Sequence, residues 1–159
     1  MNRQSTARRD ASPIRSSEEY RRLQLVEVTI DCLAELGYVG TTLMQISRRA
    51  GVSPGLVAHY FDDKDGVLAA AFRTLARRVG EQVRARLELT ETPRGRIQAV
   101  IDANLAPELC NPRTGRAWLA FWGQVLQVES FRRIQTAYQR RMLSNLRSAL
   151  RQLMPMQEA

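Results

Sequence analysis

Apolar residues recur at intervals of three and four through almost the whole chain, a spacing typical of α-helices that bury one face. No long run alternates apolar and polar residues, so β-strands are not expected. With 44% apolar residues among 159, the chain can bury a core. The sequence therefore predicts an all-α fold, with helices near residues 16–37, 42–50, 54–61, 64–87, 93–105, 114–126 and 130–153.

Two short helices joined by a glycine turn are predicted between residues 41 and 61. Thr42, with Gln45 three residues later, fits a capping box at the start of the first helix. Gly51 can take the positive φ of a tight turn, and Ser53 followed by Pro54 is typical of the start of a second helix. This layout is that of a helix-turn-helix, which reads duplex DNA. The alternative is an ordinary helical hairpin in an all-α core.

The second short helix carries side chains suited to the major groove. Pro54, Gly55 and Ala58 are small enough to let the backbone approach base edges, and Leu56 or Ala58 can touch a thymine methyl group. Hydroxyl, imidazole and ammonium groups can reach bases or phosphates. The residues predicted to contact DNA are Thr42, Ser53, Pro54, Gly55, Leu56, Ala58, His59, Tyr60 and Lys64.

Lys64 is the only lysine of the chain, and it lies at a predicted helix N-terminus. A cation there opposes the helix dipole by about 0.3–1 kcal/mol, and a bound phosphate would reverse the sign of that effect. The hypothesis is therefore a phosphate contact. The alternative is an incidental surface lysine.

The net charge of +8 does not point to the helix-turn-helix by itself. Residues 1–64 carry nine basic and eight acidic side chains, whereas residues 65–159 carry fifteen basic and eight acidic ones. Residues 1–16 contain four arginines and no core pattern, and we interpret them as a flexible arm. Such an arm either lies in a minor groove or is a disordered tail.

Three large aromatic side chains share one predicted helix face: Trp118, Phe121 and Trp122 are spaced at i, i+3 and i+4. Faces of such rings bind quaternary ammonium groups, Tyr138 can add another wall, and Asp102 or Glu108 can supply an anion. The residues predicted to bind a ligand are Trp118, Phe121, Trp122 and Tyr138. The alternative is a stripe that only packs the helix bundle.

Other functional classes are disfavoured by what the sequence lacks. A single histidine cannot form a two-histidine metal site, Cys32 and Cys110 lack ligand spacing, and there is neither a glycine-rich phosphate loop nor a GxSxG motif. We therefore expect neither an enzyme nor a cofactor. No apolar run reaches transmembrane length and the N-terminus does not resemble a secretory signal, so a cytoplasmic protein without membrane association is expected.

Three blocks resemble a known family. SRRAGVSPGLVAHYF at 47–61 is similar to the DNA-reading segment of TetR-family transcriptional regulators, and AWLAFW at 117–122 with RRMLSNL at 140–146 narrows the resemblance to its choline-responsive branch. This resemblance, over residues 18–155, implies a repressor of choline-to-glycine-betaine genes that binds a palindromic operator as a homodimer. After the arm at 1–16, which lengthens the family's usual start, it implies a helix-turn-helix domain at 17–63 and a helical ligand-binding and dimerisation domain at 64–159.

Members of this family usually continue for about forty more residues, as two helices that pair with a second subunit. We therefore expect a regulatory domain that lacks its last helices, which leaves dimerisation open. Two alternatives follow. One is a truncated or interfering regulator that keeps the DNA reader but pairs poorly, and the other is a repressor of the same family that senses a different small ligand.

Overall fold

The computed structural model describes the backbone of residues 13–153 and the side chains from residue 17 onward. Within these residues the chain forms seven helices and no strand, which confirms the all-α prediction. The helices are α1 (Pro13–Gly40), α2 (Leu43–Ala50), α3 (Pro54–Phe61), α4 (Lys64–Leu87), α5 (Pro93–Asn104), α6 (Pro112–Trp122) and α7 (Glu129–Leu153). Most of the predicted arm, residues 1–12, lies outside the described residues.

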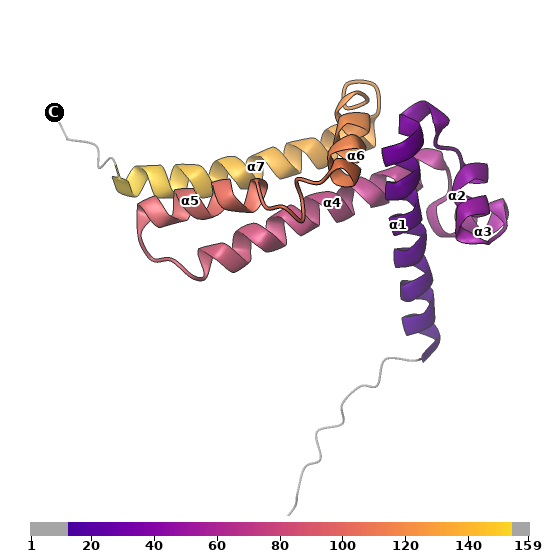
Figure 1. The fold of residues 1–159 in the computed structure, drawn as a ribbon, viewed down its shortest axis with the longest axis horizontal. Coiled ribbons are helices and arrows are strands. Elements are labelled where there is room, and N and C mark those ends of the chain that lie inside the picture. Colours follow the sequence, from indigo (N-terminus) through magenta and orange to yellow (C-terminus); the bar gives the residue numbers. More distant parts are fainter. Residues whose placement is uncertain (1–12, 154–159) are drawn as a thin grey trace, which may run out of the picture.

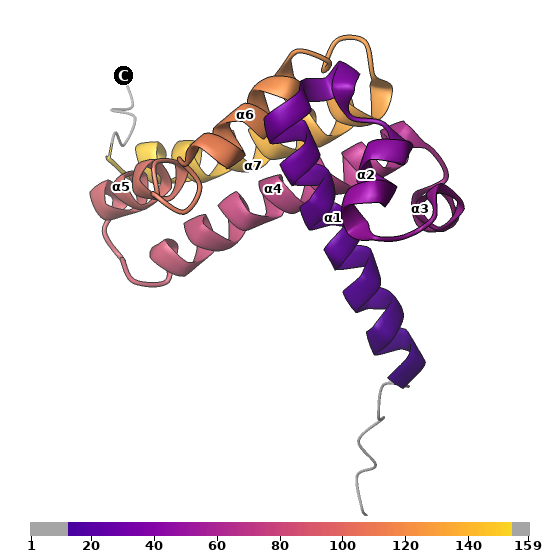
Figure 2. The same cartoon turned by 45° about the vertical axis from the view of Figure 1, so that its right-hand side comes forward.

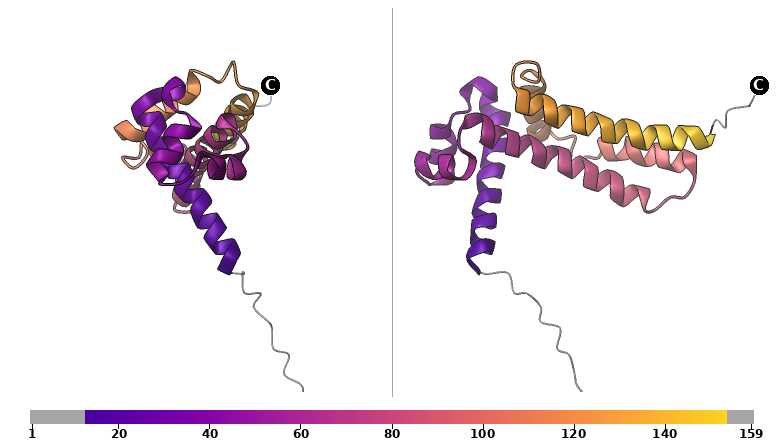
Figure 3. Two further views of the ribbon diagram at one scale, coloured as in Figure 1. Left: turned by 90° about the vertical axis from the view of Figure 1, so that its right-hand side faces the viewer. Right: turned by 180° about the vertical axis from the view of Figure 1, so that it is seen from behind.

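The helices form a head and a longer bundle. The head contains α2 and α3 packed beside α1, whereas α4, α5 and α7 run along one another away from it (Figure 1). Helix α6 lies against α1 (Figure 2). Helix α4 starts beside α3 and continues into the bundle, so it joins the two parts, as the view from behind makes clear (Figure 3).

Most helices begin at a side chain that caps the backbone. At five helix starts, an oxygen of the residue before the helix accepts the backbone N–H three residues later; these capping residues are Thr42, Ser53, Asp63, Thr92 and Asn111. In α3, α5 and α6 a proline follows the cap, and its fixed φ suits the first turn. The caps predicted at Thr42 and Ser53 are therefore confirmed.

Several predicted boundaries were wrong. Helix α1 begins at Pro13 rather than near Ser16, because proline is favoured in the first turn of a helix; four residues assigned to the arm are therefore helical. Helix α6 starts earlier than residue 114 and ends at Trp122, since the chain from Gly123 to residue 127 forms turns. The regular part of α1 breaks at Gly37, which has a φ of 66°, as the sequence predicts.

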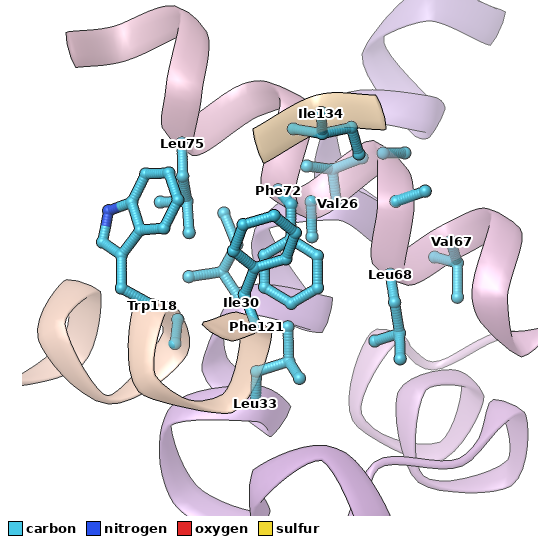
Figure 4. Close-up of a cluster of buried hydrophobic side chains, with 14 of the residues drawn as sticks. Val26, Ile30, Leu33, Val67, Leu68, Phe72, Leu75, Trp118, Phe121 and Ile134 are labelled. Carbon is cyan, nitrogen blue, oxygen red and sulfur yellow. The ribbon is translucent and has the colours of Figure 1, made fainter. Parts of the chain in front are cut away.

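One hydrophobic core connects the head with the bundle. Val26, Ile30 and Leu33 on α1 pack with Phe72 on α4 and Phe121 on α6 (Figure 4). The Phe121 ring lies 4.2 Å from that of Phe72 and 5.6 Å from that of Phe131 on α7, measured between centroids. All three of these phenylalanines are fully buried. The head and the bundle are therefore not independently packed.

Helices α1 and α7 bury their apolar residues only in part. On α1, Leu23 is exposed and the core position is taken by Leu25, because the N-terminal half of the helix extends beyond its neighbours. On α7, Phe131 and Ile134 are buried, but Leu150 and Leu153 near its end are exposed. Among the described residues, no helix has the length and hydropathy needed to cross a membrane.

Candidate DNA-reading and ligand sites

The head has the geometry of a helix-turn-helix. Helix α2 ends at Gly51, which adopts the left-handed conformation with φ 66° and ψ 34°. The N–H of Gly51 donates to the Arg48 carbonyl, and that of Val52 donates to the Ser47 carbonyl. This turn directs α3 away from α2 while Ile46, Val57 and Phe61 remain buried on the inner side.

The outer face of α3 carries the residues predicted to meet DNA. Pro54, Gly55 and His59 are exposed, and Leu56, Ala58 and Tyr60 are half-buried. Because Val57 and Phe61 fill the core, the remaining positions of α3 form one continuous outer surface. These six residues occupy the part of the α3 surface that is not buried, and Tyr60 also packs against the core.

The hydroxyls of Thr42 and Ser53 have a second possible partner. Thr42 Oγ1 accepts the N–H of Gln45 at 3.2 Å, and Ser53 Oγ accepts the N–H of Leu56 at 3.2 Å. A hydroxyl that accepts in this way still has its own hydrogen to donate. Both residues are exposed at helix N-termini, where a phosphate is also favoured by the helix dipole.

Arg22 on α1 holds the end of α3 in place. Its guanidinium donates to the Tyr60 carbonyl at 2.7 Å and lies 4.5 Å from the centroid of the Phe61 ring. A cation at a helix C-terminus also interacts favourably with the helix dipole. No local pattern in the sequence points to this residue, because the contact joins positions 38 apart in the chain.

Lys64 is held by Tyr38 at the junction of the head and the bundle. Its Nζ donates to the Tyr38 carbonyl at 2.7 Å and lies 4.3 Å from the centroid of the Tyr38 ring. An ammonium group has three hydrogens, so this contact leaves donors for a phosphate. The Asp63 cap and Asp65 in the first turn offset the unfavourable helix-dipole effect on the lysine.

Tyr38, like Arg22, holds neighbouring groups in position and was not indicated by the sequence. Its hydroxyl donates to Asp65 at 3.2 Å, so the side chain contacts both the cation and the acid at the start of α4. Burial, reinforced by the negative charge of Asp65, raises the pKa of Tyr38 above its usual 10.0. No motif signals such a contact, since Tyr38 and Lys64 lie 26 residues apart.

Arg49 on α2 is tied to α1. It forms an ion pair of 2.6 Å with Glu35, and this contact lowers the pKa of that carboxyl group. Cys32 lies beside the pair, and burial raises the pKa of its thiol although Arg49 acts in the opposite direction. The outward-facing basic groups of α2 are thus Arg48 and a partly engaged Arg49.

A charged network joins α1 to α6 and α4. Arg113 on α6 contacts the carboxylates of Asp31 and Glu27, and it donates to the Glu27 carbonyl at 3.1 Å. Arg78 on α4 forms an ion pair with the same Glu27. Helix α6, which carries three of the four predicted ligand residues, is therefore bonded directly to the helix that supports the head.

The predicted ligand residues form a closed aromatic stack. The Trp118 and Trp122 rings are nearly parallel, 5.4 Å apart between centroids and inclined by 25°, and Trp118 lies 5.7 Å from Tyr138. Trp122 Nε1 donates to Gln135 at 3.3 Å, and the Tyr138 hydroxyl donates to Asn104 at 2.7 Å. Phe121 lies beneath the stack in the core, with no exposed surface.

This packing limits where a cation can bind. Trp118 is 8% exposed, because Trp122 and Tyr138 cover its ring, whereas Trp122 is 50% exposed. A quaternary ammonium group must therefore separate the stack or lie on the outer face of Trp122. Of the two candidate anions, Asp102 accepts a hydrogen bond from Gln98 on its own helix, and Glu108 is exposed.

A large cavity lies beside this stack rather than within it. It has a volume of about 960 Å³, opens to solvent and is lined by α4, α5 and α7. Tyr138 and Asn104 form part of its wall, but Trp118, Phe121 and Trp122 do not. The four predicted ligand residues therefore do not line one common pocket.

Comparison with known proteins assigns the family. Residues 25–71 match the model of bacterial regulatory proteins of the tetR family, and residues 93–159 match the C-terminal part of BetI-type transcriptional repressors. The chain is similar to the HTH-type transcriptional regulators BetI of Serratia proteamaculans and Pectobacterium atrosepticum. It is 38% and 39% identical to them, covering 87% of this chain in each case and 71% and 72% of theirs.

Solved structures agree with this comparison. A transcriptional regulator from Pseudomonas aeruginosa aligns with a TM-score of 0.80 and 34% identity, over 87% of this chain and 67% of its own. A regulator from Saccharomonospora viridis, solved in complex with choline, shares the fold with a TM-score of 0.75 and 18% identity, over 84% of this chain and 69% of its own.

The chain therefore belongs to the TetR family of bacterial transcriptional regulators. Its C-terminal part is of the BetI type. The resemblance inferred from the three sequence blocks is confirmed. These relatives define the class of the protein, which is a transcriptional repressor that binds DNA and not an enzyme.

Proposed function

We propose that the protein represses transcription by placing the outer face of α3 in the major groove of an operator, and that it responds to choline. The controlled genes would be those that convert choline to glycine betaine. The observation that carries this proposal is the exposed surface of α3, formed by small and hydrogen-bonding side chains that follow the Ser53 cap. The BetI relatives support the choice of effector.

The proposed DNA contacts divide into two kinds. Pro54, Gly55 and Ala58 allow close approach, Leu56 offers apolar contact, and His59 can donate to a base. The hydroxyls of Thr42, Ser53 and Tyr60 and the ammonium of Lys64 are suited to phosphates, which fix the register on the duplex. The anchoring of α3 by Arg22 reduces the ordering cost on binding.

The proposed choline site is the outer face of Trp122, together with Trp118 and Tyr138 after the stack opens. Cation–π contact contributes about 0.5–2 kcal/mol per ring, depending on desolvation. The Saccharomonospora viridis regulator, which has the same fold, was solved with choline bound. Phe121 would support the site from the core rather than contact the cation.

A series of contacts connects this site with the head that carries α3. Helix α6 carries Trp118 and Trp122 and also Arg113, which bonds to Glu27 and Asp31 on α1. Opening of the aromatic stack would displace α6, and the ion pairs would transmit that displacement to α1. We propose that choline alters operator affinity by this route.

A titration with choline tests the ligand proposal. Wild-type protein is expected to show saturable binding by calorimetry and a change in tryptophan fluorescence, and Trp122→Ala should abolish the calorimetric signal. Trp122→Phe keeps a ring face and should retain weaker binding, whereas Leu126→Ala, an exposed apolar control, should bind as wild type. A flat titration up to millimolar choline would exclude choline as the effector.

We also propose that the protein acts as a homodimer on a palindromic operator, because linking two half-site contacts raises affinity without new contacts. Light scattering after size-exclusion chromatography tests this point. A stable dimer is the expected result. A monomer would favour the alternative of a regulator that keeps its DNA reader but interferes with, or depends on, another protein.

A further inference from the structure

Tyr38 lies where the end of α1, the start of α4 and α7 meet. The centroid of its ring is 4.3 Å from Lys64 Nζ, and its hydroxyl donates to Asp65 at 3.2 Å. The ring also packs against that of Phe131 on α7, with centroids 6.2 Å apart and planes nearly perpendicular. Phe131 is fully buried in the core. One half-buried side chain therefore connects a cation at the edge of the head with the core of the bundle.

The backbone of Tyr38 holds the same lysine. Helix α1 ends at Gly40, so the Tyr38 carbonyl is one of the last four of the helix, which have no donor within it. Lys64 Nζ supplies the donor at 2.7 Å. A lysine has a flexible four-carbon stem, so contact with both the carbonyl and the ring of one residue fixes the position of its ammonium group.

The positive charge of Lys64 is not neutralised within the described part of the chain. No carboxylate there forms an ion pair with it, although Asp63 and Asp65 flank it in the sequence. Asp63 accepts the N–H of Gly66 at 2.7 Å, and Asp65 accepts the Tyr38 hydroxyl, so each carboxylate has another partner. A carbonyl and an aromatic face bind an ammonium group without cancelling its charge, and hydrogens remain for an anion.

We propose that Tyr38 is a positioning residue for the DNA contact of Lys64. Its carbonyl and ring hold the ammonium group where it meets a phosphate, and Phe131 supports the ring from the bundle. The inference rests on the proposed DNA binding and adds to it a residue that does not itself contact DNA. A lysine that is already ordered in the free protein loses less conformational entropy when it binds the phosphate.

The single lysine of the chain allows this contact to be observed directly. In protein labelled only at lysine, nuclear magnetic resonance reports one side chain. Protons held over the face of an aromatic ring are shielded, so the ε-methylene signals of Lys64 should lie upfield of their usual position in wild type and in Tyr38→Phe, which keeps the ring. They should return toward that position in Tyr38→Leu, which keeps the carbonyl but has no ring.

DNA binding at several salt concentrations measures what the contact does. Tyr38→Leu is expected to weaken binding of palindromic and random duplexes alike, by about threefold to tenfold, because phosphates carry no sequence information. Its salt slope should fall toward that of Lys64→Ala, which is expected to be about one below wild type. Tyr38→Phe should stay within about twofold of wild type. Val39→Ala, a control that changes the exposed neighbouring residue, should bind as wild type.

A double-mutant cycle separates positioning from a general loss of structure. In the Lys64→Ala background, Tyr38→Leu should have no further effect on DNA binding, because the group that Tyr38 positions is already absent. Tyr38→Met, a second variant without a ring, is measured in the same way. Circular dichroism verifies that each variant is folded at the temperature of the measurement.

The possible failures have separate meanings. Wild-type lysine signals at their usual position would show that the ring does not hold Lys64, and would overturn the inference without any DNA. If wild type binds DNA, an unchanged salt slope in the ring-free variants, or a further loss on adding Tyr38→Leu to Lys64→Ala, would overturn it and leave the proposed function intact. Absence of DNA binding by wild type at low salt would overturn both.

Discussion

The Ser53 hydroxyl accepts the N–H of Leu56 at the start of α3 and lies on the surface predicted to face DNA. The Ser53 side chain therefore contributes both to the stability of α3 and to the predicted DNA interface. A substitution that keeps the cap but adds a negative charge separates these two contributions. Aspartate is as good an N-cap as serine, but it carries a negative charge toward the phosphates.

Ser53→Asp is expected to keep the stability of the protein and lose DNA binding. Its free energy of unfolding should stay within about 0.5 kcal/mol of wild type, while affinity for duplex DNA falls at least about tenfold through charge repulsion. Ser53→Ala should instead lose about 0.5–2 kcal/mol of stability with the cap. Thermal unfolding and fluorescence anisotropy measure the two effects. Wild-type DNA affinity in Ser53→Asp would remove Ser53 from the interface.

Cys32 gives a prediction for pH. Burial raises the pKa of its thiol above 9.0, so the folded chain holds the proton more tightly than the unfolded chain does. This contribution to stability is complete below pH 9.0 and is lost as the pH rises through the higher pKa of the folded state. Tyr38 and Tyr138, whose pKa values are also raised, add losses that begin nearer pH 10.0.

Urea unfolding between about pH 8 and about pH 10 measures the effect. Wild type should lose stability across this range, and Cys32→Ala should lose less. Cys110→Ala, which changes an exposed cysteine, should follow wild type. Parallel pH profiles for wild type and Cys32→Ala would show that Cys32 is not the source.

At this scale the sequence revealed the caps and the outer face of α3, because both depend on local spacing. It did not reveal Arg22 or Tyr38, whose contacts join residues 38 and 26 positions apart. The sequence also predicted Phe121 to be a ligand residue together with Trp118 and Trp122, although Phe121 is buried in the core. Helical spacing places side chains on one face but does not say how deeply each is buried.

At the scale of helices, the contact between α1 and α6 depends on Arg113. Its guanidinium faces two carboxylates, Glu27 and Asp31, and is about one-third exposed. Its removal would leave Asp31 without its ion-pair partner and Glu27 paired with Arg78 alone, within α1 and α4. For comparison, the ion pair between Arg77 and Glu81 lies within α4 alone, and its side chains are more exposed.

Arg113→Gln should therefore lower the free energy of unfolding by about 1–2 kcal/mol, against about 0.5 kcal/mol or less for Arg77→Gln. Urea unfolding at low salt measures both. Added salt should reduce the difference, since it screens the exposed charges. Equal effects of the two substitutions would contradict a special role for the α1–α6 network.

Helix number and order were predictable because apolar periodicity and caps are local signals. The ends of α1 and α6 were not, since several residues near each end are compatible with a start or a stop. The charged network on α1 was also not predictable. Glu27 and Asp31 are four residues apart in sequence, but their partner Arg113 comes from α6.

For the whole molecule, the shared core predicts a single cooperative unfolding transition. Phe121→Ala should cost about 3–5 kcal/mol, because the fully buried ring contacts both Phe72 and Phe131. Leu119→Ala on the exposed side of the same helix should cost about 0.5 kcal/mol or less. Far-ultraviolet circular dichroism and tryptophan fluorescence should report the same transition. Two separate transitions would contradict a common core.

We propose above that the outer face of α3 reads an operator. The most direct test is fluorescence anisotropy with a palindromic duplex taken from the DNA upstream of the protein's own gene, beside a random duplex of equal length. The wild-type protein should bind the palindrome more tightly than the random duplex, and Ser53→Asp should bind both at least about tenfold more weakly than wild type, although it remains folded. Equal binding of the two duplexes, no binding at low salt, or undiminished binding by Ser53→Asp would contradict the claim.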